Sequence, residues 1–272
     1  MEGITVTNLS YTYQGAREAL KDVSFHVTAG KKLAVLGANG SGKSTLIQHF
    51  NGLILPQKGT VKIRGEFVEK KNLKTLRQKV GIIFDQPDDQ ILASTVYEDV
   101  AFGPRNLRLS EEEVQQRVKQ ALEQMEIEEL GKASPYELSL GQKKKVAIAG
   151  VLAMKPEVLV FDEPFSGLDP LSREGLKKAL DALHRLGHTL IFTTHNVDIA
   201  YQWADQLLIL KEGQVLHSGR VEALEDEKLV SKGNLELPTL VKILQGTGIS
   251  EKNPAIINRT LKEALDIGKQ QK

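Results

Sequence analysis

The sequence predicts an α/β fold in which a mixed sheet forms the core, with an antiparallel β subdomain at the amino terminus and a helical subdomain. Three observations support this fold class. Apolar and polar residues alternate in patches over about the first 35 positions and again at 59 to 68. Short apolar runs follow from residue 80 onward. The chain between the first two of these runs has helical periodicity.

The alternating segments include ITVTNL, VSFHVTAG, KLAVLG and GTVKIRGEFV, and they predict mostly antiparallel strands. The apolar runs are VGIIF after residue 79, EVLVFD at 157 to 162 and TLIFTTH at 189 to 195. Continuous apolar runs of this length are typical of parallel strands that are covered on both faces. The sequence therefore predicts a parallel core that follows an antiparallel amino-terminal region.

A helical subdomain is expected at about 88–155. Its clearest helix is SEEEVQQRVKQALEQM, which begins with a predicted capping box between Ser110 and Glu113. Apolar residues recur along one face of this helix at Val114, Val118, Leu122 and Met125.

The carboxy-terminal part of the chain has a different sequence pattern, which predicts a hairpin and then helices. QLLILKEGQVLHSG predicts a hairpin that turns at Glu212 and Gly213. Residues 221–272 are expected to form a small helical extension, with a short helix in LELPTLVKILQ and a frayed end at GKQQK. We expect residues 1–220 to form the main domain.

Charge, cysteine content and the length of the apolar runs limit which partners, covalent links and locations can be expected. The net charge is +1, so the overall charge gives no reason to expect a nucleic-acid partner. Cysteine is absent, which excludes disulfides and thiolate metal sites and fits a reducing compartment. No apolar run reaches 18 residues and no export signal is visible, so we expect neither a membrane span nor secretion.

The segment GANGSGKST follows the apolar strand LAVL and opens a helix, which is the strand, turn and helix context of a phosphate-binding P-loop. Glycines let successive backbone N–H groups close around phosphates. Lys43 would add a positive charge between phosphates, and the Ser44 hydroxyl would ligate Mg²⁺. The candidate nucleotide-binding residues here are Gly37, Asn39, Gly40, Ser41, Gly42, Lys43, Ser44 and Thr45.

Two carboxylates end the second apolar run, at the edge where open α/β sheets bind ligands. Asp162 is expected to hold Mg²⁺, and Glu163 is expected to orient and deprotonate an attacking water. His195 ends the third run and could sense a γ-phosphate oxygen. His184 and His188 are four residues apart, but Gly187 lies between them at a predicted helix end, so a metal site is disfavoured.

A second phosphate site is predicted at ELSLGQKKK, where Ser139 and Gly141 lie at the start of a helix. Free N–H groups and the positive end of the helix dipole favour an anion there. The three lysines that follow, 143 to 145, could be either a solvated helix face or further phosphate contacts.

Taken in order, the P-loop, the LSLGQ turn, FDEP, SGLDP and the strand that ends in His195 resemble the nucleotide-binding subunits of ATP-binding cassette (ABC) transporters. The resemblance covers about residues 1–220 and implies a P-loop NTPase fold of the ABC ATPase type, with ATP and Mg²⁺ as cofactors. It also implies two subunits facing each other head to tail, so that the LSLGQ turn of one, with Ser139, Gly141 and Gln142, seals the ATP of the other.

The same resemblance assigns further roles. Asp169 would lie at the dimer seam and report the state of one site to the other. Tyr13 would stack on adenine, with Tyr11 as the alternative, since alternate strand residues share a face and one of them could belong to the core.

IIFDQPDDQILASTVYEDVAFGPRNLRLS and KKKVAIAGVLAMKPEVLVFDEP narrow the resemblance to the ATPases of energy-coupling factor (ECF) importers, most closely those for cobalt and nickel. The implied partners are a second ATPase, a transmembrane scaffold and a small membrane protein that captures the substrate. The implied location is the cytoplasmic face of the cell membrane, as a peripheral subunit. A vitamin importer, in which the chain would pair with a paralogue, is the alternative.

The sequence departs from the family pattern at two places. Asp85 stands where the family has a glutamine that reaches Mg²⁺, and Gln86 follows it. Either Gln86 reaches in, or the Asp85 carboxylate binds Mg²⁺ and slows hydrolysis by repelling the γ-phosphate. Leu140 replaces a glycine of the LSLGQ turn, and Lys145 stands where arginine is common.

The sequence disfavours two other functions. A soluble ABC ATPase acting on ribosomes or DNA would be expected to have two cassettes, a coiled coil or a basic surface, and the sequence predicts none of these. A nucleotide switch without turnover is disfavoured because Glu163, the expected base, is present.

Overall fold

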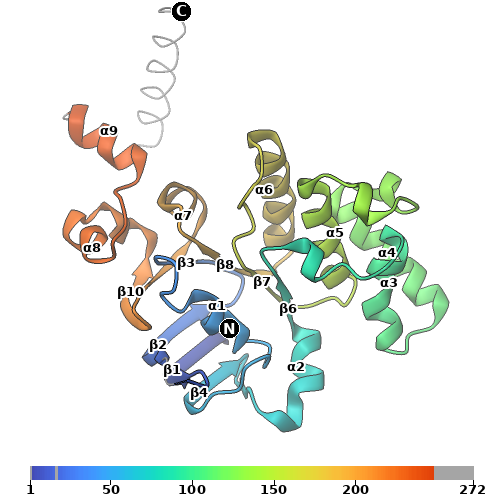
Figure 1. The fold of residues 1–272 in the computed structure, drawn as a ribbon, viewed down its shortest axis with the longest axis horizontal. Coiled ribbons are helices and arrows are strands. Elements are labelled where there is room, and N and C mark those ends of the chain that lie inside the picture. The colour runs from blue at the N-terminus through green and yellow to red at the C-terminus, as the bar shows by residue number, and fades with distance from the viewer. Residues whose placement is uncertain (1, 16–17, 248–272) are drawn as a thin grey trace, which may run out of the picture.

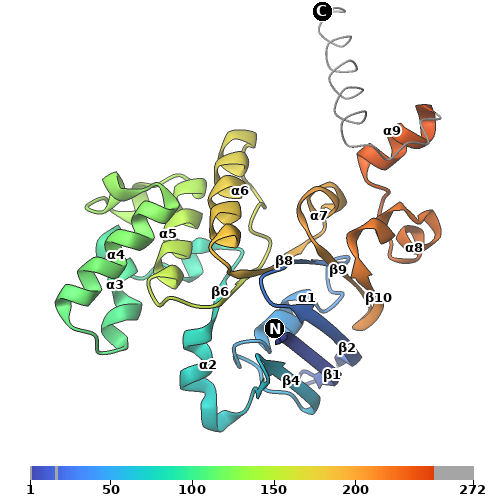
Figure 2. The same cartoon turned by 180° about the vertical axis from the view of Figure 1, so that it is seen from behind.

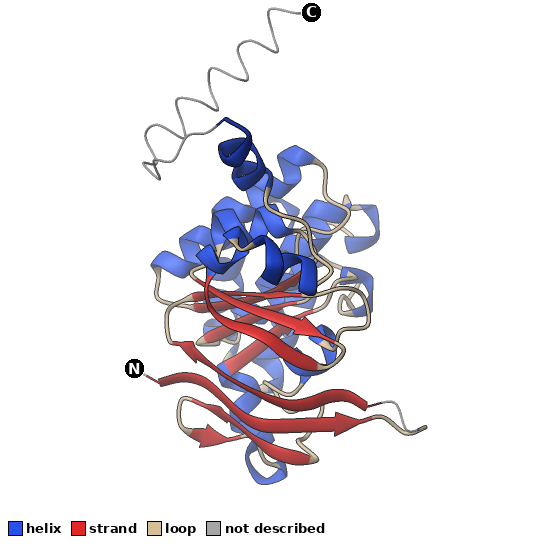
Figure 3. Cartoon of the chain, turned by 90° about the vertical axis from the view of Figure 1, so that its left-hand side faces the viewer, coloured by secondary structure: helices blue, strands red, loops and turns tan. Residues whose placement is uncertain are grey.

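The computed structural model describes residues 2–15 and 18–247, and its strands form two sheets (Figures 1 and 3). In the described chain, the first sheet has the strand order β2-β1-β4-β5 and is antiparallel throughout. Its strands are β1 Glu2–Thr12, β2 Glu18–Thr28, β4 Lys58–Ile63 and β5 Glu66–Phe67. This sheet confirms the antiparallel β subdomain that the alternating segments predicted.

The second sheet is mixed and has the order β10-β9-β3-β8-β7-β6 in the described residues. Its strands are β3 Lys32–Leu36, β6 Val80–Ile83, β7 Val158–Phe161, β8 Thr189–Thr194, β9 Gln206–Lys211 and β10 Gln214–Arg220. Strands β6, β7, β8, β3 and β9 run parallel, which confirms the prediction for the three apolar runs.

The expectation for KLAVLG was wrong. This segment forms β3, which pairs in parallel with β8 on one side and β9 on the other. The reason is burial on both faces: every residue of β3 after Lys32 is buried, and a continuous apolar run rather than an alternating one is the pattern of a central parallel strand.

Strands β9 and β10 form the predicted hairpin. Its turn residues Glu212 and Gly213 both have positive φ, 51° and 79°. Two positive φ values are the geometry of a type I′ turn, which matches the twist of the flanking strands.

The described helices are α1 Lys43–Gln48, α2 Leu73–Lys79, α3 Val96–Asn106, α4 Glu111–Met125, α5 Leu140–Leu152, α6 Pro170–Arg185, α7 Val197–Trp203, α8 Glu227–Lys232 and α9 Thr239–Thr247. Helices α3, α4 and α5 lie together at one end of the molecule, and α8 and α9 lie at the other (Figures 1 and 2). The helical subdomain therefore stands beside the mixed sheet.

The capping box predicted at the start of α4 is only half formed. The Ser110 hydroxyl accepts a hydrogen bond from the Glu113 backbone N–H at 3.3 Å, as a helix cap should. The Glu113 carboxylate instead accepts from Arg117 at 2.6 Å, one helical turn further on. An ion pair at this spacing keeps the carboxylate away from the backbone of Ser110.

The mixed sheet separates two hydrophobic clusters, because alternate residues of a strand point to opposite faces. On β7, Leu159 and Phe161 join the cluster that contains α3 to α6, whereas Val158 and Val160 join the cluster that contains α1 and the antiparallel sheet. Both faces of the sheet are thus covered, and the carboxyl ends of its parallel strands lie at one edge.

The chain after β10 packs onto the same core. Leu224 and Val230 are buried in the cluster that covers the α3 to α6 face. The Thr239 backbone N–H and hydroxyl donate to the two oxygens of Asp198 at 2.6 and 2.8 Å, which ties α9 to α7. The short helix expected in LELPTLVKILQ begins there, at Thr239, and continues to Thr247, and GKQQK lies outside the described residues.

None of the helices in the described part of the chain has both the length and the apolar character that crossing a membrane requires.

Candidate nucleotide-binding site

The loop between β3 and α1 needs glycine at specific positions. Gly42 has a φ of 104°, and a Cβ placed there would lie 2.7 Å from the carbonyl oxygen of Ala19. A Cβ on Gly37 would lie 2.5 Å from the carbonyl oxygen of Leu210. Both distances are too short for any side chain, so the loop can close against β2 and β9 only with glycine.

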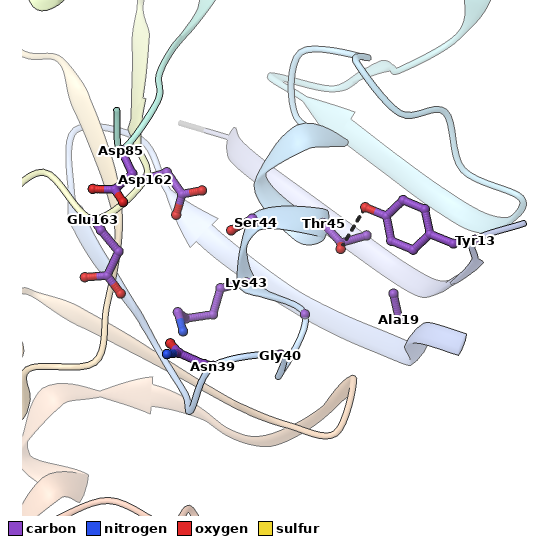
Figure 4. Close-up of a pocket in the computed structure, with 11 residues that line it drawn as sticks. Tyr13, Ala19, Asn39, Gly40, Lys43, Ser44, Thr45, Asp85, Asp162 and Glu163 are labelled. Atoms are coloured by element: carbon purple, nitrogen blue, oxygen red, sulfur yellow. Dashed lines mark hydrogen bonds between the residues drawn. The ribbon is translucent and has the colours of Figure 1, made fainter. Parts of the chain in front are cut away.

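A pocket of about 410 Å³ opens over this loop. In Figure 4, acidic side chains lie at one end of the pocket, Lys43 at its centre and Tyr13 at the other end. Its lining residues are Tyr13, Ala19, Asn39, Gly40, Gly42, Lys43, Ser44, Thr45, Asp85, Asp162 and Glu163. The predicted P-loop and the predicted carboxylate pair therefore meet in one cavity, although they are more than a hundred residues apart in the sequence.

Lys43 is buried and turns back onto its own loop. Its Nζ donates to the carbonyl oxygens of Gly37 at 2.7 Å and Ala38 at 3.3 Å. An ammonium group has three N–H donors, so one is left for a ligand. Burial lowers the pKa of Lys43, while the negative charges of Glu163 and Asp162 oppose that change.

Asp162 and Glu163 are held by a residue that the sequence did not single out. The Thr193 hydroxyl donates to Asp162 Oδ1 at 2.5 Å and accepts from the Glu163 backbone N–H at 2.9 Å. Thr193 is buried in β8, beside the end of β7. Glu163 itself has a φ of 45°, in the left-handed region, so the chain turns sharply at this residue.

His195 contacts Glu163. The His195 Nδ1 lies 3.1 Å from Glu163 Oε1, and the carboxylate accepts the hydrogen bond. The proton is then on Nδ1, and the Nε2 of a neutral ring can only accept. For a neutral ring to donate to a phosphate oxygen through Nδ1, the ring would have to turn away from Glu163. His195 has room to turn, since its side chain is 66% exposed.

The residues at the acidic end suit a hydrated divalent cation. Ser44, Asp85 and Asp162 supply hydroxyl and carboxylate oxygens, the ligands that Mg²⁺ prefers. The glycine loop, the spare N–H of Lys43 and the start of α1 suit phosphate. The donor set thus fits a Mg²⁺–nucleotide complex.

The structure distinguishes Asp85 from Gln86. Asp85 lines the pocket, whereas Gln86 is exposed and outside the lining. The Gln86 amide Nε2 is 3.4 Å from Asp85 Oδ2, so it touches the carboxylate rather than the cavity. Of these two residues, Asp85 is therefore the one that lines the pocket.

The two tyrosines that were candidates for stacking on adenine lie in different environments. Tyr13 lines the pocket, is 40% exposed and has its hydroxyl 3.1 Å from the Thr45 hydroxyl. Tyr11 packs edge to face against His49 at 5.2 Å and contributes to the core. An aromatic face is therefore available to a base at Tyr13.

The LSLGQ turn lies outside this pocket. Ser139 caps α5 through a complete capping box, in which its hydroxyl accepts from the Gln142 N–H at 3.3 Å and the Gln142 side chain accepts from the Ser139 N–H at 2.9 Å. Two backbone N–H groups at the predicted anion site, those of Ser139 and Gln142, are thus already bound. Gly141 lies close to Ser172, because a Cβ on it would be 3.0 Å from the Ser172 side chain.

Asp169 caps the next helix. Its carboxylate accepts from the backbone N–H groups of Leu171 and Ser172 at 2.9 and 3.0 Å, at the start of α6. The Ser172 hydroxyl also donates to it at 2.5 Å. These bonds, that from the Ser172 side chain first, lower the pKa of Asp169.

Neither interpretation of the three lysines at 143 to 145 holds for Lys144. Lys143 pairs with Asp88 at 2.7 Å, and Lys145 lies 3.9 Å from Glu126. Lys144 is buried, with its Nζ against backbone carbonyls. The sequence did contain a signal: Lys144 shares the helical spacing of the buried Ala147, Ile148 and Val151.

His184 and His188, the histidine pair of the disfavoured metal site, are not part of the pocket lining. His184 Nε2 lies 2.9 Å from the carbonyl oxygen of Gly30, where it serves packing. No group of three or more histidine, aspartate or glutamate side chains within residues 2–15 and 18–247 is arranged to hold a metal ion.

Comparisons with known proteins agree with this geometry. Residues 20–166 match the family model described as ABC transporter. An energy-coupling factor transporter ATP-binding protein EcfA from Carboxydothermus hydrogenoformans is 43% identical over 242 residues, which are 89% of this chain and 90% of that protein.

Two solved structures have the same fold. The structure of cbiO1 from Clostridium perfringens, described as part of the ABC transporter complex cbiONQ, is 39% identical, with a TM-score of 0.78 over 90% of this chain and 99% of that one. A dimeric ATP-binding cassette in a post-hydrolysis state, bound to ADP and Pi, is 29% identical, with a TM-score of 0.72 over 80% of this chain and 98% of that one.

The P-loop, the carboxylates after β7 and the LSLGQ turn occur together in a P-loop fold of the ABC ATPase type. The family match and the 43% identity extend over most of the chain. An ATPase of this family uses ATP with Mg²⁺. The chain belongs to the ABC transporter family, as an ATP-hydrolysing subunit of the energy-coupling factor type.

Proposed function

We propose that this chain powers import of cobalt or nickel ions from the cytoplasmic face of the cell membrane, through cycles of closure and opening of an ATPase pair. One observation carries the proposal: the chain has a phosphate-binding pocket and, outside that pocket, a second helix start of the kind that binds phosphate. Ser139 at this helix start is exposed. A single copy leaves both features incomplete.

A head-to-tail pair of ATPase chains would complete both phosphate-binding features. Under two-fold symmetry, each copy presents Ser139 and Gly141 to the pocket of the other, so that both pockets are completed at once. Asp169 and the SGLDP loop would lie along the seam. Because the triphosphate alone contacts both halves, ATP favours the closed pair and hydrolysis favours release. This difference in contacts is what could move a membrane partner.

Each residue of the pocket would have a separate role in ATP hydrolysis. Lys43 and the loop N–H groups bind the phosphates, and Tyr13 stacks on the base. Ser44, Asp162 and Asp85 would hold Mg²⁺, which would offset phosphate charge when bound. Glu163 orients a water and accepts its proton as the oxygen attacks the γ-phosphorus, and ADP leaves with inorganic phosphate as the other product.

The partners follow from the subfamily. A transmembrane scaffold would receive the motion, and a small membrane protein would bind the cargo, so no residue of this chain needs to touch the ion. The cobalt or nickel assignment is supported by the resemblance of residues 82 to 110 and 143 to 164 to importers of those metals. A vitamin importer, with a paralogue as the second ATPase, is the competing assignment.

The first experiment is the mass in solution of the Glu163→Gln chain with and without MgATP. Removing the base should trap the ATP-bridged pair, so light scattering should shift from monomer to dimer only when MgATP is present. The same variant carrying Ser139→Arg serves as the control: it should bind ATP and stay monomeric, because the arginine blocks the partner's pocket.

The outcomes separate the assignments. A nucleotide-dependent dimer supports a self-paired importer ATPase of the cobalt or nickel type. A Glu163→Gln chain that binds ATP and stays monomeric contradicts self-pairing and favours the paralogue. Uptake of radioactive cobalt by cells that express the chain with its scaffold and capture protein, and its loss on Lys43→Ala, tests the cargo.

A further inference from the structure

The ammonium group of Lys144 is enclosed by backbone. The side chain is 4% exposed, and its Nζ donates to the carbonyl oxygens of Glu163 at 3.1 Å, Pro164 at 3.2 Å and Ser166 at 2.9 Å. An ammonium has three N–H donors, so all of them are used. Lys144 thus belongs to α5 but holds the turn that follows β7.

This turn determines where the Glu163 carboxylate points. Glu163 has a positive φ of 45°, a conformation that a residue with a side chain keeps only when its surroundings impose it. Its N–H is held by the Thr193 hydroxyl and its C=O by Lys144. The backbone is therefore fixed on both sides of the Cα that aims the carboxylate at the pocket.

Lys144 also faces Asp85. Its Nζ lies 3.7 Å from Asp85 Oδ1, which is too long for a hydrogen bond and close enough for strong charge attraction. Burial lowers the pKa of Lys144, and the neighbouring charges of Asp85 and Glu163 oppose that change. One buried cation therefore contacts both the Asp85 carboxylate and the main chain of Glu163, two residues that line the pocket from different segments.

We propose that Lys144 is a positioning residue for ATP hydrolysis, which fixes the turn carrying Glu163 and compensates the charge of Asp85. This compensation is what allows a carboxylate at position 85, beside the phosphate end of the pocket, without the full repulsion of the γ-phosphate. The inference rests on the proposed role of Glu163 as the base. It implies that the need for a cation at position 144 depends on the charge at position 85.

A double-mutant cycle on the full chain tests this dependence. The variants are Lys144→Gln, Asp85→Asn and the two together, with steady-state ATPase rates measured at saturating Mg²⁺. Glutamine removes the charge and keeps two N–H donors, although its amide nitrogen lies one bond short of the position of Nζ. We expect Lys144→Gln to lower kcat about 20-fold and to change KM for MgATP less than about 3-fold, since the pocket itself is intact.

Adding Asp85→Asn to Lys144→Gln should then raise kcat by about 5-fold or more, because the uncompensated carboxylate is gone. Lys145→Gln, on the same helix and 3.9 Å from Glu126, is the matched control and should leave kcat and KM within about 2-fold. Thermal unfolding of each variant identifies any loss that comes from the fold.

Additive effects in the cycle, or a kcat for Lys144→Gln equal to that of Lys145→Gln, would overturn the proposal. The Glu163→Gln chain keeps this result separate from the proposed function. If Glu163→Gln still hydrolyses ATP, the assigned base is wrong whatever the cycle shows. If Glu163→Gln is inactive and the cycle is additive, only the role of Lys144 fails.

Discussion

The hydroxyl of Thr193 donates a 2.5 Å hydrogen bond to the Oδ1 of Asp162. The same oxygen accepts from the backbone N–H of Glu163 at 2.9 Å. A single buried hydroxyl on β8 therefore fixes the position of two groups. These are the Asp162 carboxylate, which is expected to hold Mg²⁺, and the backbone of Glu163, the residue that is expected to activate water. The hydroxyl can do so because β7 and β8 are neighbours in the parallel sheet.

Thr193→Val should damage the site while nearly preserving volume. The valine leaves the Glu163 N–H and the Asp162 carboxylate without their partner, and we expect a loss of about 1–3 kcal/mol of unfolding free energy. The Mg²⁺ concentration for half-maximal ATPase activity should rise. Urea unfolding and a Mg²⁺ titration measure the two effects. Thr194→Val, whose hydroxyl accepts only from Asn196 N–H among the described contacts, should leave the Mg²⁺ requirement unchanged.

Asp85 and Gln86 can be separated by mutation. Because Asp85 lines the pocket and Gln86 is exposed, Asp85→Gln should raise the Mg²⁺ requirement several-fold, whereas Gln86→Ala should leave turnover within about 2-fold. Steady-state rates over a range of Mg²⁺ concentrations measure this. If Gln86→Ala alone impairs turnover, the carboxylate does not occupy the metal-facing position.

Stability should fall in mild acid because of His49. This residue is fully buried; its Nδ1 donates to the Thr45 carbonyl at 2.7 Å, and its Nε2 has no hydrogen-bond partner. Burial lowers the pKa of His49 below 6.5, and the bond to Thr45 only partly opposes this. The unfolded chain therefore takes up a proton below about pH 6.5 that the folded chain excludes.

The free energy of unfolding is therefore retained above pH 6.5 and falls as the pH drops toward the pKa of His49 in the folded chain. Each pKa unit of lowering is worth about 1.4 kcal/mol. Denaturant unfolding at pH 7.5, 6.5 and 5.5 should show this slope, and His49→Gln should reduce it. His188, whose pKa burial also lowers, should leave part of the slope in that variant. His26→Gln, at an exposed position on β2, is the control, and an unchanged slope in His49→Gln would contradict the assignment.

Asp181 joins α6 to the sheet and to α7. Its Oδ1 accepts from Trp203 Nε1 at 2.6 Å and from Lys32 Nζ at 3.1 Å. Asp181→Leu would leave a largely buried lysine and an indole N–H unpaired, and we expect a loss of about 2–4 kcal/mol. Trp203 is the only tryptophan in the chain, so its fluorescence should report the change directly.

Two further variants serve as controls for the stability loss expected in Asp181→Leu. Asp181→Asn keeps an acceptor for the indole and should cost less than Asp181→Leu. Glu174→Gln removes an exposed pair on the same helix, with Lys178 at 3.9 Å, and should change stability by less than about 0.5 kcal/mol. Equal losses in Asp181→Leu and Glu174→Gln would show that the buried contacts add nothing.

The extension after residue 220 should strengthen pairing. A cut at about 225 would remove Val230 from the hydrophobic cluster that contains α3 to α6, so the cleaner test is a chain that ends at Glu236 and lacks α9, whose buried Val241 is outside both clusters. We expect this chain to bind ATP with unchanged affinity and to need a higher concentration to dimerise in the Glu163→Gln background. Light scattering at several concentrations measures the shift, and an unchanged midpoint would remove the extension from the interface.

The sequence by itself determined three of the parallel strands, β6, β7 and β8, together with the P-loop and the carboxylate pair. These features are local: GANGSGKST has its required strand and helix on either side, and Asp162 and Glu163 directly follow a buried apolar run. Local spacing is sufficient to recognise these residues, because the strand and helix around the P-loop and the buried strand before the carboxylates are all neighbours in the sequence.

Only the tertiary structure decided what lies beside them. Thr193 reaches Asp162 through the register of two parallel strands, and Lys144 reaches the turn after β7 through the packing of α5 on the mixed sheet. β3 was expected among antiparallel strands because neighbouring alternation was extended to it, and its partners come from β8 and β9, more than 150 residues later. Contacts between distant segments depend on how whole elements pack, and a one-dimensional pattern carries no record of that register.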